Sequence, residues 1–151
     1  MIVLDTNIVS EFMTSPPAEP VSAWLNTQNT ADLYLTTISI AEIGFGLQVM
    51  PDGKRRRLLA DRFERFLAVA FESRILSFEE RAARIYGRIR GHRREQGRPM
   101  SNFDGQIAAI AKSRGFAVAT RNVKDFEECG LELINPFRSY GVQGELDSKT
   151  S

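Results

Sequence analysis

Short apolar segments alternate with longer helix-like segments along the chain, and this alternation narrows the possible folds more than any other feature. Residues 2–4, 33–37, 75–76, 116–119 and 131–134 are brief, mainly apolar runs that we predict to be buried strands. Segments with apolar residues at helical spacing lie between them. The pattern predicts an α/β fold, with a central, mainly parallel sheet of about four to five strands flanked by helices.

The expected helices begin and end at recognisable residues. Thr6 is suited to cap a helix that ends near Met13, and Ser39 is expected to begin the helix after the second strand. Gly115 is suited to end the helix before the fourth strand. Further helical segments are expected around residues 21–25, 58–70, 79–96 and 101–112.

The chain has 151 residues, of which 42% are hydrophobic. This is enough for one buried core, so we expect one domain over residues 1–137 and a polar, flexible tail over residues 138–151. The 20 Lys and Arg residues nearly balance the 19 Asp and Glu residues. The whole chain is therefore no polycation, and any nucleic-acid surface has to come from local separation of charge.

Cysteine content and hydropathy restrict the cellular setting. Cys129 is the single cysteine, which excludes an internal disulfide and a cysteine-based zinc cluster. No apolar run approaches the roughly 18 residues of a membrane span. These features predict a cytoplasmic protein with no membrane association.

Acidic or amide side chains occur where predicted strands give way to helices or turns. Asp5 follows the first strand, and Glu42 and Asp104 lie near the starts of helices. Asn122 and Asp125 follow the fourth strand. Ligands of parallel α/β sheets bind outside the carboxyl ends of the strands, so these side chains are expected at one edge. Clustered carboxylates repel one another unless a cation or proton compensates, and the sequence therefore predicts a divalent-metal site.

Three of these carboxylates also have a purely structural interpretation. Asp5 could cap a helix. Glu42 stands three residues after Ser39, in the spacing of a capping box, and its side chain could fold back onto the helix start. Asp104 stands in the same relation to Ser101. A capping carboxylate bonds its own backbone, whereas a metal ligand points into a shared cavity.

The residues after the fourth strand leave a similar choice. Asn122 could offer its amide oxygen to a metal or orient a water, and Asp125 competes with it for that role. Asp125 could instead cap a short helix over residues 126–129. Thr120 could offer its hydroxyl to water or cap the turn.

The helix expected over residues 79–96 is strongly basic. Its arginines outnumber the local acidic partners, Glu79, Glu80 and Glu95. A solvated face with intrahelical ion pairs is one interpretation, but the excess positive charge favours contact with phosphate. The arginines that we expect to contact a nucleic-acid backbone, here and beyond the helix, are Arg88, Arg90, Arg93, Arg94, Arg98 and Arg121.

Four motifs follow one another along residues 1–137. They are Asp5-Thr6-Asn7 after an apolar strand, Ala41-Glu42 on a helix, Asp104 followed by Ile107-Ala108-Ala109, and Ala119-Thr120-Arg121-Asn122 before Asp125-Phe126. In this order and spacing they resemble the PIN-domain ribonucleases, and most closely the VapC/FitB-type toxins of bacterial toxin–antitoxin pairs. Each motif is weak alone, but the ordered set is specific.

The resemblance implies an endoribonuclease that depends on Mg²⁺ or Mn²⁺, with its first three acidic positions on Asp5, Glu42 and Asp104. We expect Asp5 and Asp104 to bind the metal directly, and Glu42 to bind it directly or through a water. Family analogy also places Thr6 and Thr120 near the metal and its waters.

The chain departs from the family pattern at the fourth acidic position. That position often carries aspartate and here is Asn122. The change weakens any second metal site, or shifts its role to Asp125 or Thr120.

The resemblance further implies partners and products. It implies RNA as substrate, 5′-phosphate and 3′-hydroxyl ends, a small cognate antitoxin, and a homodimer or a larger hetero-oligomer with that antitoxin. Two alternatives stay open. One is a structure-specific DNA nuclease that uses the same pocket, and the other is a non-catalytic nucleic-acid-binding or regulatory module.

Overall fold

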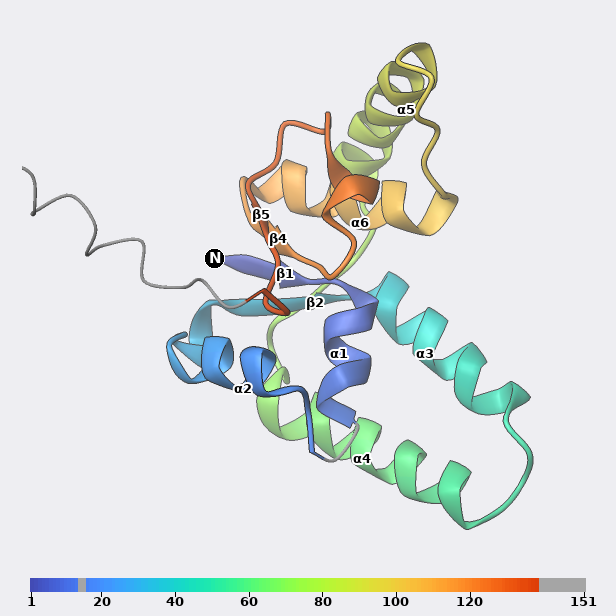
Figure 1. The fold of residues 1–151 in the computed structure, drawn as a ribbon. Coiled ribbons are helices and arrows are strands. Elements are labelled where there is room, and N and C mark those ends of the chain that lie inside the picture. Colours follow the sequence, from blue (N-terminus) through green and yellow to red (C-terminus); the bar gives the residue numbers. More distant parts are fainter. Residues whose placement is uncertain (14–15, 139–151) are drawn as a thin grey trace, which may run out of the picture.

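The computed structural model describes residues 1–13 and 16–138, which form one sheet with helices on both faces (Figure 1). The strands are β1 (Ile2–Leu4), β2 (Leu33–Thr36), β3 (Ile75–Leu76), β4 (Ala117–Ala119) and β5 (Leu133–Ile134). The α-helices are α1 (Thr6–Met13), α2 (Glu19–Asn26), α3 (Thr37–Val49), α4 (Lys54–Ala70), α5 (Glu80–Glu95) and α6 (Asn102–Arg114). Two 3₁₀ helices complete the described part, η1 (Thr30–Asp32) and η2 (Val123–Phe126).

The sheet is fully parallel, with the strand order β3-β2-β1-β4-β5. The predicted α/β class and the predicted number of strands are therefore confirmed. The chain runs outward from β1 to β2 and β3, and then returns to β4 on the other side of β1. Such a reversal opens a crevice beyond the carboxyl ends of the two strands beside it, here β1 and β4.

Successive residues of β1 point to opposite faces of the sheet, as the two-residue period of a strand requires. Val3 belongs to a core that includes Ile107 of α6, whereas Leu4 belongs to a second core with Ile8 of α1 and Phe63 of α4. Figure 1 shows α5 and α6 on one side of the sheet and α1, α2 and α4 on the other. Both faces of the short central strand are thereby buried, which explains its continuous apolar sequence.

Helices α5 and α6 approach each other closely at Gly105. A Cβ atom at this position would lie 2.9 Å from Cε2 of Tyr86 and 3.1 Å from Cδ of Arg90. A larger residue would require the side chains of Tyr86 and Arg90 to shift, so glycine permits this close approach of α5 beside Asp104.

Three predicted helix boundaries need correction. Helix α3 begins at Thr37 and not at Ser39, because the hydroxyl of Thr36 accepts the backbone N–H of Ser39 and caps the helix. Thr6 is the first residue of α1 and not its cap. Asp125 lies inside η2, so it does not cap a helix over residues 126–129.

The structure bears on two further expectations. None of the helices in the described ranges combines the length and the apolar character needed to cross a membrane. Apart from Arg138, the polar tail expected over residues 138–151 lies outside the described residues.

Candidate functional site

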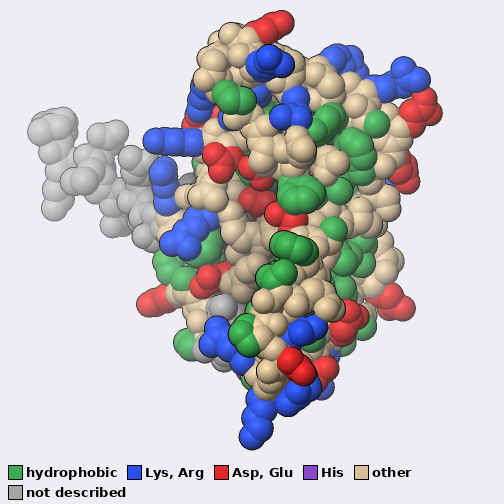
Figure 2. All heavy atoms as spheres, turned by 90° about the vertical axis from the view of Figure 1, so that its right-hand side faces the viewer, with side chains coloured by type: hydrophobic (Ala, Val, Ile, Leu, Met, Phe, Trp, Pro, Cys, Tyr) green, Lys and Arg blue, Asp and Glu red, His purple; other side chains and the backbone are tan. Residues whose placement is uncertain are grey.

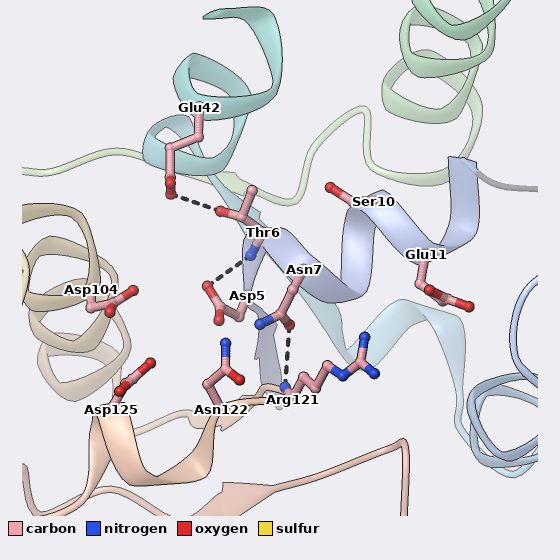
Figure 3. A pocket seen from close by; sticks show the side chains of 10 residues that line it. All are labelled: Asp5, Thr6, Asn7, Ser10, Glu11, Glu42, Asp104, Arg121, Asn122 and Asp125. Atoms are coloured by element: carbon pink, nitrogen blue, oxygen red, sulfur yellow. Dashed lines mark hydrogen bonds between the residues drawn. The ribbon is translucent and has the colours of Figure 1, made fainter. Parts of the chain in front are cut away.

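An acidic cleft of about 490 Å³ lies beyond the carboxyl ends of β1 and β4. Its lining residues come from four separate parts of the chain (Figure 3): Asp5, Thr6, Asn7, Ser10, Glu11, Glu42, Asp104, Arg121, Asn122 and Asp125. In Figure 2, acidic side chains gather in the middle of the face shown, with Lys and Arg side chains at its top, at its bottom and along its left side. The topology therefore brings the predicted strand-end residues together.

Asp5 is the most buried of these carboxylates, with 5% of its surface exposed. Its Oδ1 accepts the backbone N–H of Thr6 and its Oδ2 accepts the hydroxyl of Thr120, both at 2.8 Å. Burial raises the pKa of Asp5 from 3.8 to about 6, and the charges of Asp104 and Glu42 add to this increase, although the two hydrogen bonds oppose it. The position is thus costly for a negative charge that lacks a cation beside it.

Glu42 points into the cleft from the second turn of α3 (Figure 3). Its Oε1 accepts the hydroxyl of Thr6 at 2.8 Å, and the Thr6 hydroxyl also shares a hydrogen bond with Ser39. The capping-box interpretation of Glu42 is therefore wrong, since Thr36 caps the helix and Glu42 bonds a different element. Burial raises the pKa of Glu42, the hydrogen bond from Thr6 lowers it, and the charge of Asp104 raises it further.

Asp104 stands in the first turn of α6, one residue before the glycine that meets α5. Its backbone N–H donates to the Ser101 hydroxyl at 3.1 Å, so Ser101 is the cap. The carboxylate of Asp104 faces Asp5 and Asp125 across the cleft (Figure 3). Burial is the main cause that raises the pKa of Asp104, and the charge of Asp125 contributes in the same direction.

Thr120 holds the end of β4 against Asp5. It is fully buried, and its hydroxyl donates to Asp5 and accepts the backbone N–H of Asn122 at 3.0 Å. A second tie joins the same turn to α1, because the backbone N–H of Arg121 donates to Oδ1 of Asn7 at 3.2 Å. Thr120 therefore positions Asp5 and the turn, and its one hydroxyl proton is committed to Asp5.

The cleft offers oxygen ligands suited to a hard divalent cation. Its described lining residues supply carboxylates, hydroxyls, amides and the guanidinium of Arg121, and none of them is histidine or cysteine. Within residues 1–13 and 16–138, no three His, Cys, Asp or Glu side chains are already close enough to enclose a metal ion. Mg²⁺ does not need such a cage, because it keeps several waters and is usually held by one or two carboxylates together with substrate phosphate. The residues present thus fit an open Mg²⁺-type site.

The arginines expected on a nucleic-acid surface do not behave alike. Arg88, Arg94 and Arg121 are exposed, and Arg121 lines the cleft with its guanidinium 4.6 Å from the ring centre of Phe137. Arg93 is 3% exposed and its guanidinium donates to backbone carbonyls, so its predicted contact with nucleic acid is wrong.

Two further arginines from that set are partly engaged within the protein. Arg90 bonds the hydroxyl of Tyr86 and Oδ1 of Asn102, at 3.0 and 2.7 Å. Arg98 pairs with Glu127 at 2.6 Å. Each is half-buried. Contact with a nucleic acid would therefore compete with these internal bonds.

Sequence reasoning missed three residues of α1 that line the cleft, Asn7, Ser10 and Glu11. They lie three and four residues apart, and this spacing puts them on one face of a helix. The polar stripe was thus a readable signal. Oε1 of Glu11 accepts the backbone N–H of Ala18 at 2.6 Å, so this residue also helps to hold the chain that leads into α2.

Comparison with known proteins identifies the family. The model of the PIN domain family matches residues 2–130. VapC ribonuclease Y4jK of Sinorhizobium fredii is 42% identical over 137 residues, which cover 91% of this chain and 98% of that protein. Toxin FitB of Neisseria gonorrhoeae is 38% identical over 137 residues, or 91% of this chain and 99% of that protein.

Solved structures agree with the sequence relatives. The structure of FitAB bound to an IR36 DNA fragment matches 91% of this chain and 96% of its own chain, with a TM-score of 0.85 and 38% identity. The structure of FitAcB from Neisseria gonorrhoeae matches with a TM-score of 0.84, and the matched parts are 91% and 99% of the two chains. The chain therefore belongs to the PIN-domain family, in its VapC/FitB-type branch.

Proposed function

We propose that this protein is a metal-dependent endoribonuclease and the toxin of a toxin–antitoxin pair. One observation carries the proposal: Asp5, Glu42, Asp104 and Asp125, from four separate segments, line one cleft at the carboxyl edge of the sheet. Arg121 is the one cation among the described lining residues, and it lies against Phe137. Bringing these carboxylates together is expensive unless a cation compensates. The relatives of this protein include proteins named as ribonucleases and one named as a toxin.

Asp5 and Asp104 are the residues that would hold a divalent cation directly, with Glu42 acting directly or through a water. Such a cation would supply a Lewis acid that activates water and offsets the negative charge on the phosphate oxygens. Mg²⁺ and Mn²⁺ are the ions that this set of oxygen ligands favours. Asn122 and Asp125 stand on the opposite wall, where Asp125 can add charge and Asn122 a neutral amide oxygen.

The threonines of the cleft keep these carboxylates in place. Thr120 fixes one oxygen of Asp5, and Thr6 bridges α1 to Glu42 on α3. Because each hydroxyl joins elements distant in sequence, the acidic side chains are oriented before any ligand arrives. Preorganisation of this kind lowers the reorganisation needed during the reaction.

The RNA backbone needs cationic side chains, because the acidic cleft alone would repel it. Arg88, Arg94 and Arg121 are the exposed arginines proposed for this contact, with Arg90 and Arg98 as secondary candidates. In this arrangement the arginines attract the RNA backbone, and the carboxylates hold the cation at the scissile phosphate. RNA as substrate fits action in the cytoplasm.

An apolar groove beside the cleft supports an antitoxin partner. Met13, Ile43, Leu47 and Leu59 contribute its apolar wall, and it shares Thr6, Ser10 and Glu42 with the acidic cleft. A peptide with apolar side chains followed by a basic one would fit both features. Exposed apolar side chains on α3 and α4, including Phe45 and Val69, provide surface for a homodimer or for a larger assembly with the antitoxin.

The test is cleavage of a mixed, structured RNA pool by purified, antitoxin-free protein. Reactions contain Mg²⁺, Mn²⁺ or chelator, and single-stranded DNA is offered at equal salt. Asp104→Asn removes one carboxylate charge, and Asp61→Asn makes the same change at an exposed position on α4. We expect metal-dependent cutting that leaves 5′-phosphate and 3′-hydroxyl ends. Asp104→Asn should lower the rate by about a hundredfold or more, and Asp61→Asn should leave it unchanged.

Three results would contradict the proposal. RNA cleavage that persists in chelator would show that the reaction does not depend on a divalent metal. Full activity of Asp104→Asn would remove the acidic cleft as the site of reaction. Cutting of DNA in preference to RNA would assign the cleft to a DNA nuclease.

A further inference from the structure

Arg93 is a cation placed in the interior of the protein. Its Nε donates to the carbonyl of Arg98 at 2.7 Å, and its Nη1 donates to the carbonyls of Lys124 and Glu127 at 3.2 and 2.6 Å. A buried charge is costly unless it is fully hydrogen-bonded. Two of these bonds join Arg93 to residues 31 and 34 positions later in the chain. The buried charge of Arg93 is therefore compensated only while that distant segment keeps its conformation.

That segment consists of η2 and the residues that follow it to Gly130. Its Glu127 carboxylate pairs with Arg98, and its Glu128 carboxylate lies 3.7 Å from His92. Glu128 has a φ of 63°, a left-handed conformation that non-glycine residues adopt only when their surroundings impose it. The carbonyl of Gly130 accepts Nζ of Lys112 at 2.9 Å. The C-terminal part of α5, the turn after it and α6 thus hold this segment at several points, of which Arg93 is the buried one.

Asn122 directly precedes η2, and η2 carries Asp125 into the acidic cleft. A shift of η2 would therefore change the wall that faces Asp104. The charge of Arg93 also lowers the pKa of Asp104, against the larger opposite effect of burial. Arg93 does not line the cleft, and it influences the cleft through the position of η2.

We propose that Arg93 is a positioning residue, whose guanidinium fixes η2 so that Asn122 and Asp125 form the wall of the cleft opposite Asp104. This inference rests on the proposed nuclease function for its kinetic consequence, but its structural part stands alone. The planar guanidinium offers several donors in fixed directions, whereas the ammonium of lysine is a compact point charge on a flexible stem. Charge alone therefore does not replace it.

The experiment compares Arg93→Met, Arg93→Lys and the control Arg84→Met. Arg84 lies on the same helix, where its exposed side chain pairs with Glu80. Amide hydrogen exchange over residues 122–128 reports the position of η2 without any RNA or metal. Cleavage with saturating Mn²⁺ then separates kcat from KM at a temperature where circular dichroism shows each variant folded.

Arg93→Met and Arg93→Lys should both speed exchange of the Asp125 amide by about tenfold or more, since its bond to the Asn122 carbonyl opens with η2. Both should lower kcat by about tenfold or more, with KM for RNA changed less than about threefold. Arg84→Met should match the wild type in every measurement. A residue that served stability alone would lower the melting temperature and leave kcat of the folded protein intact.

Normal exchange and normal kcat in folded Arg93→Met would overturn the proposal, and so would full recovery in Arg93→Lys. An effect confined to KM would also overturn the proposal, because the loss of η2 positioning should lower kcat. If Arg93→Met does not fold, Arg93→Lys decides, because it keeps the charge and removes the planar guanidinium: faster exchange over residues 122–128 supports the proposal, and exchange at the wild-type rate overturns it. Should the wild type cut no RNA, the exchange result still tests the position of η2.

Discussion

The carboxylates of the acidic cleft and the arginines of α5 owe their positions to different features of the fold. Asp5, Glu42, Asp104 and Asp125 lie near the ends of strands or the starts of helices, and the parallel strand order brings such residues together at one edge of the sheet. The arginines of α5 are neighbours in sequence, yet Arg93 is buried and Arg94 is exposed. Topology therefore places the residues of the cleft, whereas burial decides the role of each arginine.

The largest expected effect separates activity from stability inside the cleft. Asp5→Asn removes a charge that burial makes costly, so the rate of RNA cleavage should fall by about a hundredfold or more. The same change relieves a charge that costs on the order of 3 kcal/mol at neutral pH, because the pKa of Asp5 is raised to about 6. The amide nitrogen of asparagine cannot accept one of the two hydrogen bonds that Asp5 accepts, which costs about 1–3 kcal/mol, so the unfolding free energy should rise only slightly. Cleavage assays and urea unfolding without metal check both. An Asp5→Asn protein that is less stable by more than about 3 kcal/mol, the upper cost of one lost hydrogen bond, would contradict an electrostatic cost of Asp5.

The pH dependence of stability tests the same charge in the wild type. Since the pKa of Asp5 is about 6 when folded and 3.8 ordinarily, the folded state binds its proton more tightly. The contribution of Asp5 to stability is therefore fully present below pH 3.8 and is lost as pH rises through about 6.

Mg²⁺ can take the place of that proton, so it should raise the melting temperature more at about pH 7.5 than at about pH 5. Thermal melts of wild type and Asp5→Asn give the comparison. An equal Mg²⁺ effect at both pH values would show that the ion binds away from Asp5.

A smaller effect should follow the loss of the hydroxyl behind Asp5. Thr120→Val leaves a buried carboxylate oxygen and the N–H of Asn122 without a partner, which should cost about 1–3 kcal/mol of stability. Cleavage should slow by about tenfold, because Asp5 loses one of its two anchors. Thr120→Ser is the matched control, since it keeps the hydroxyl. If valine is tolerated as well as serine, packing and not hydrogen bonding holds this position.

The smallest effect is expected on the arginine side of the comparison. Replacing Arg88 and Arg94 with glutamine should weaken RNA binding by severalfold. It should also reduce the magnitude of the slope of log affinity against log salt concentration by about 1–2. The paired change of Arg81 and Arg84 on the same helix serves as the control. Binding measured at several salt concentrations decides, and an unchanged salt slope would remove Arg88 and Arg94 from the RNA surface.

The strands and the candidate site could largely be predicted from the sequence, because strand ends are marked by the change from apolar to acidic residues, as at Asp5. The start of α3 could not, since Thr36, Thr37 and Ser39 all offer a capping hydroxyl and the length of β2 decides among them. Glu42 looked like part of a cap for the same reason.

The burial of Arg93 was the harder case. It continues the stripe of Ala82 and Ile89, which are buried, at the spacing of a helix face. This spacing is compatible with an inward side chain, although the excess positive charge of the helix favours contact with phosphate and predicts Arg93 on the nucleic-acid surface. Two of its three acceptors, the carbonyls of Lys124 and Glu127, lie 31 and 34 residues further along the chain, and nothing local in the sequence reveals that this segment returns to α5.

The most direct test of the central claim is to locate the bound cation on the polypeptide itself. Fe²⁺ bound in place of Mg²⁺, with ascorbate and peroxide, cuts the nearby backbone, and mass spectrometry maps the cuts. We expect cuts beside Asp5, Glu42, Asp104 and residues 120–125, all suppressed by excess Mg²⁺. Cuts confined to one segment, or unaffected by Mg²⁺, would contradict a single cation site shared by these four parts of the chain.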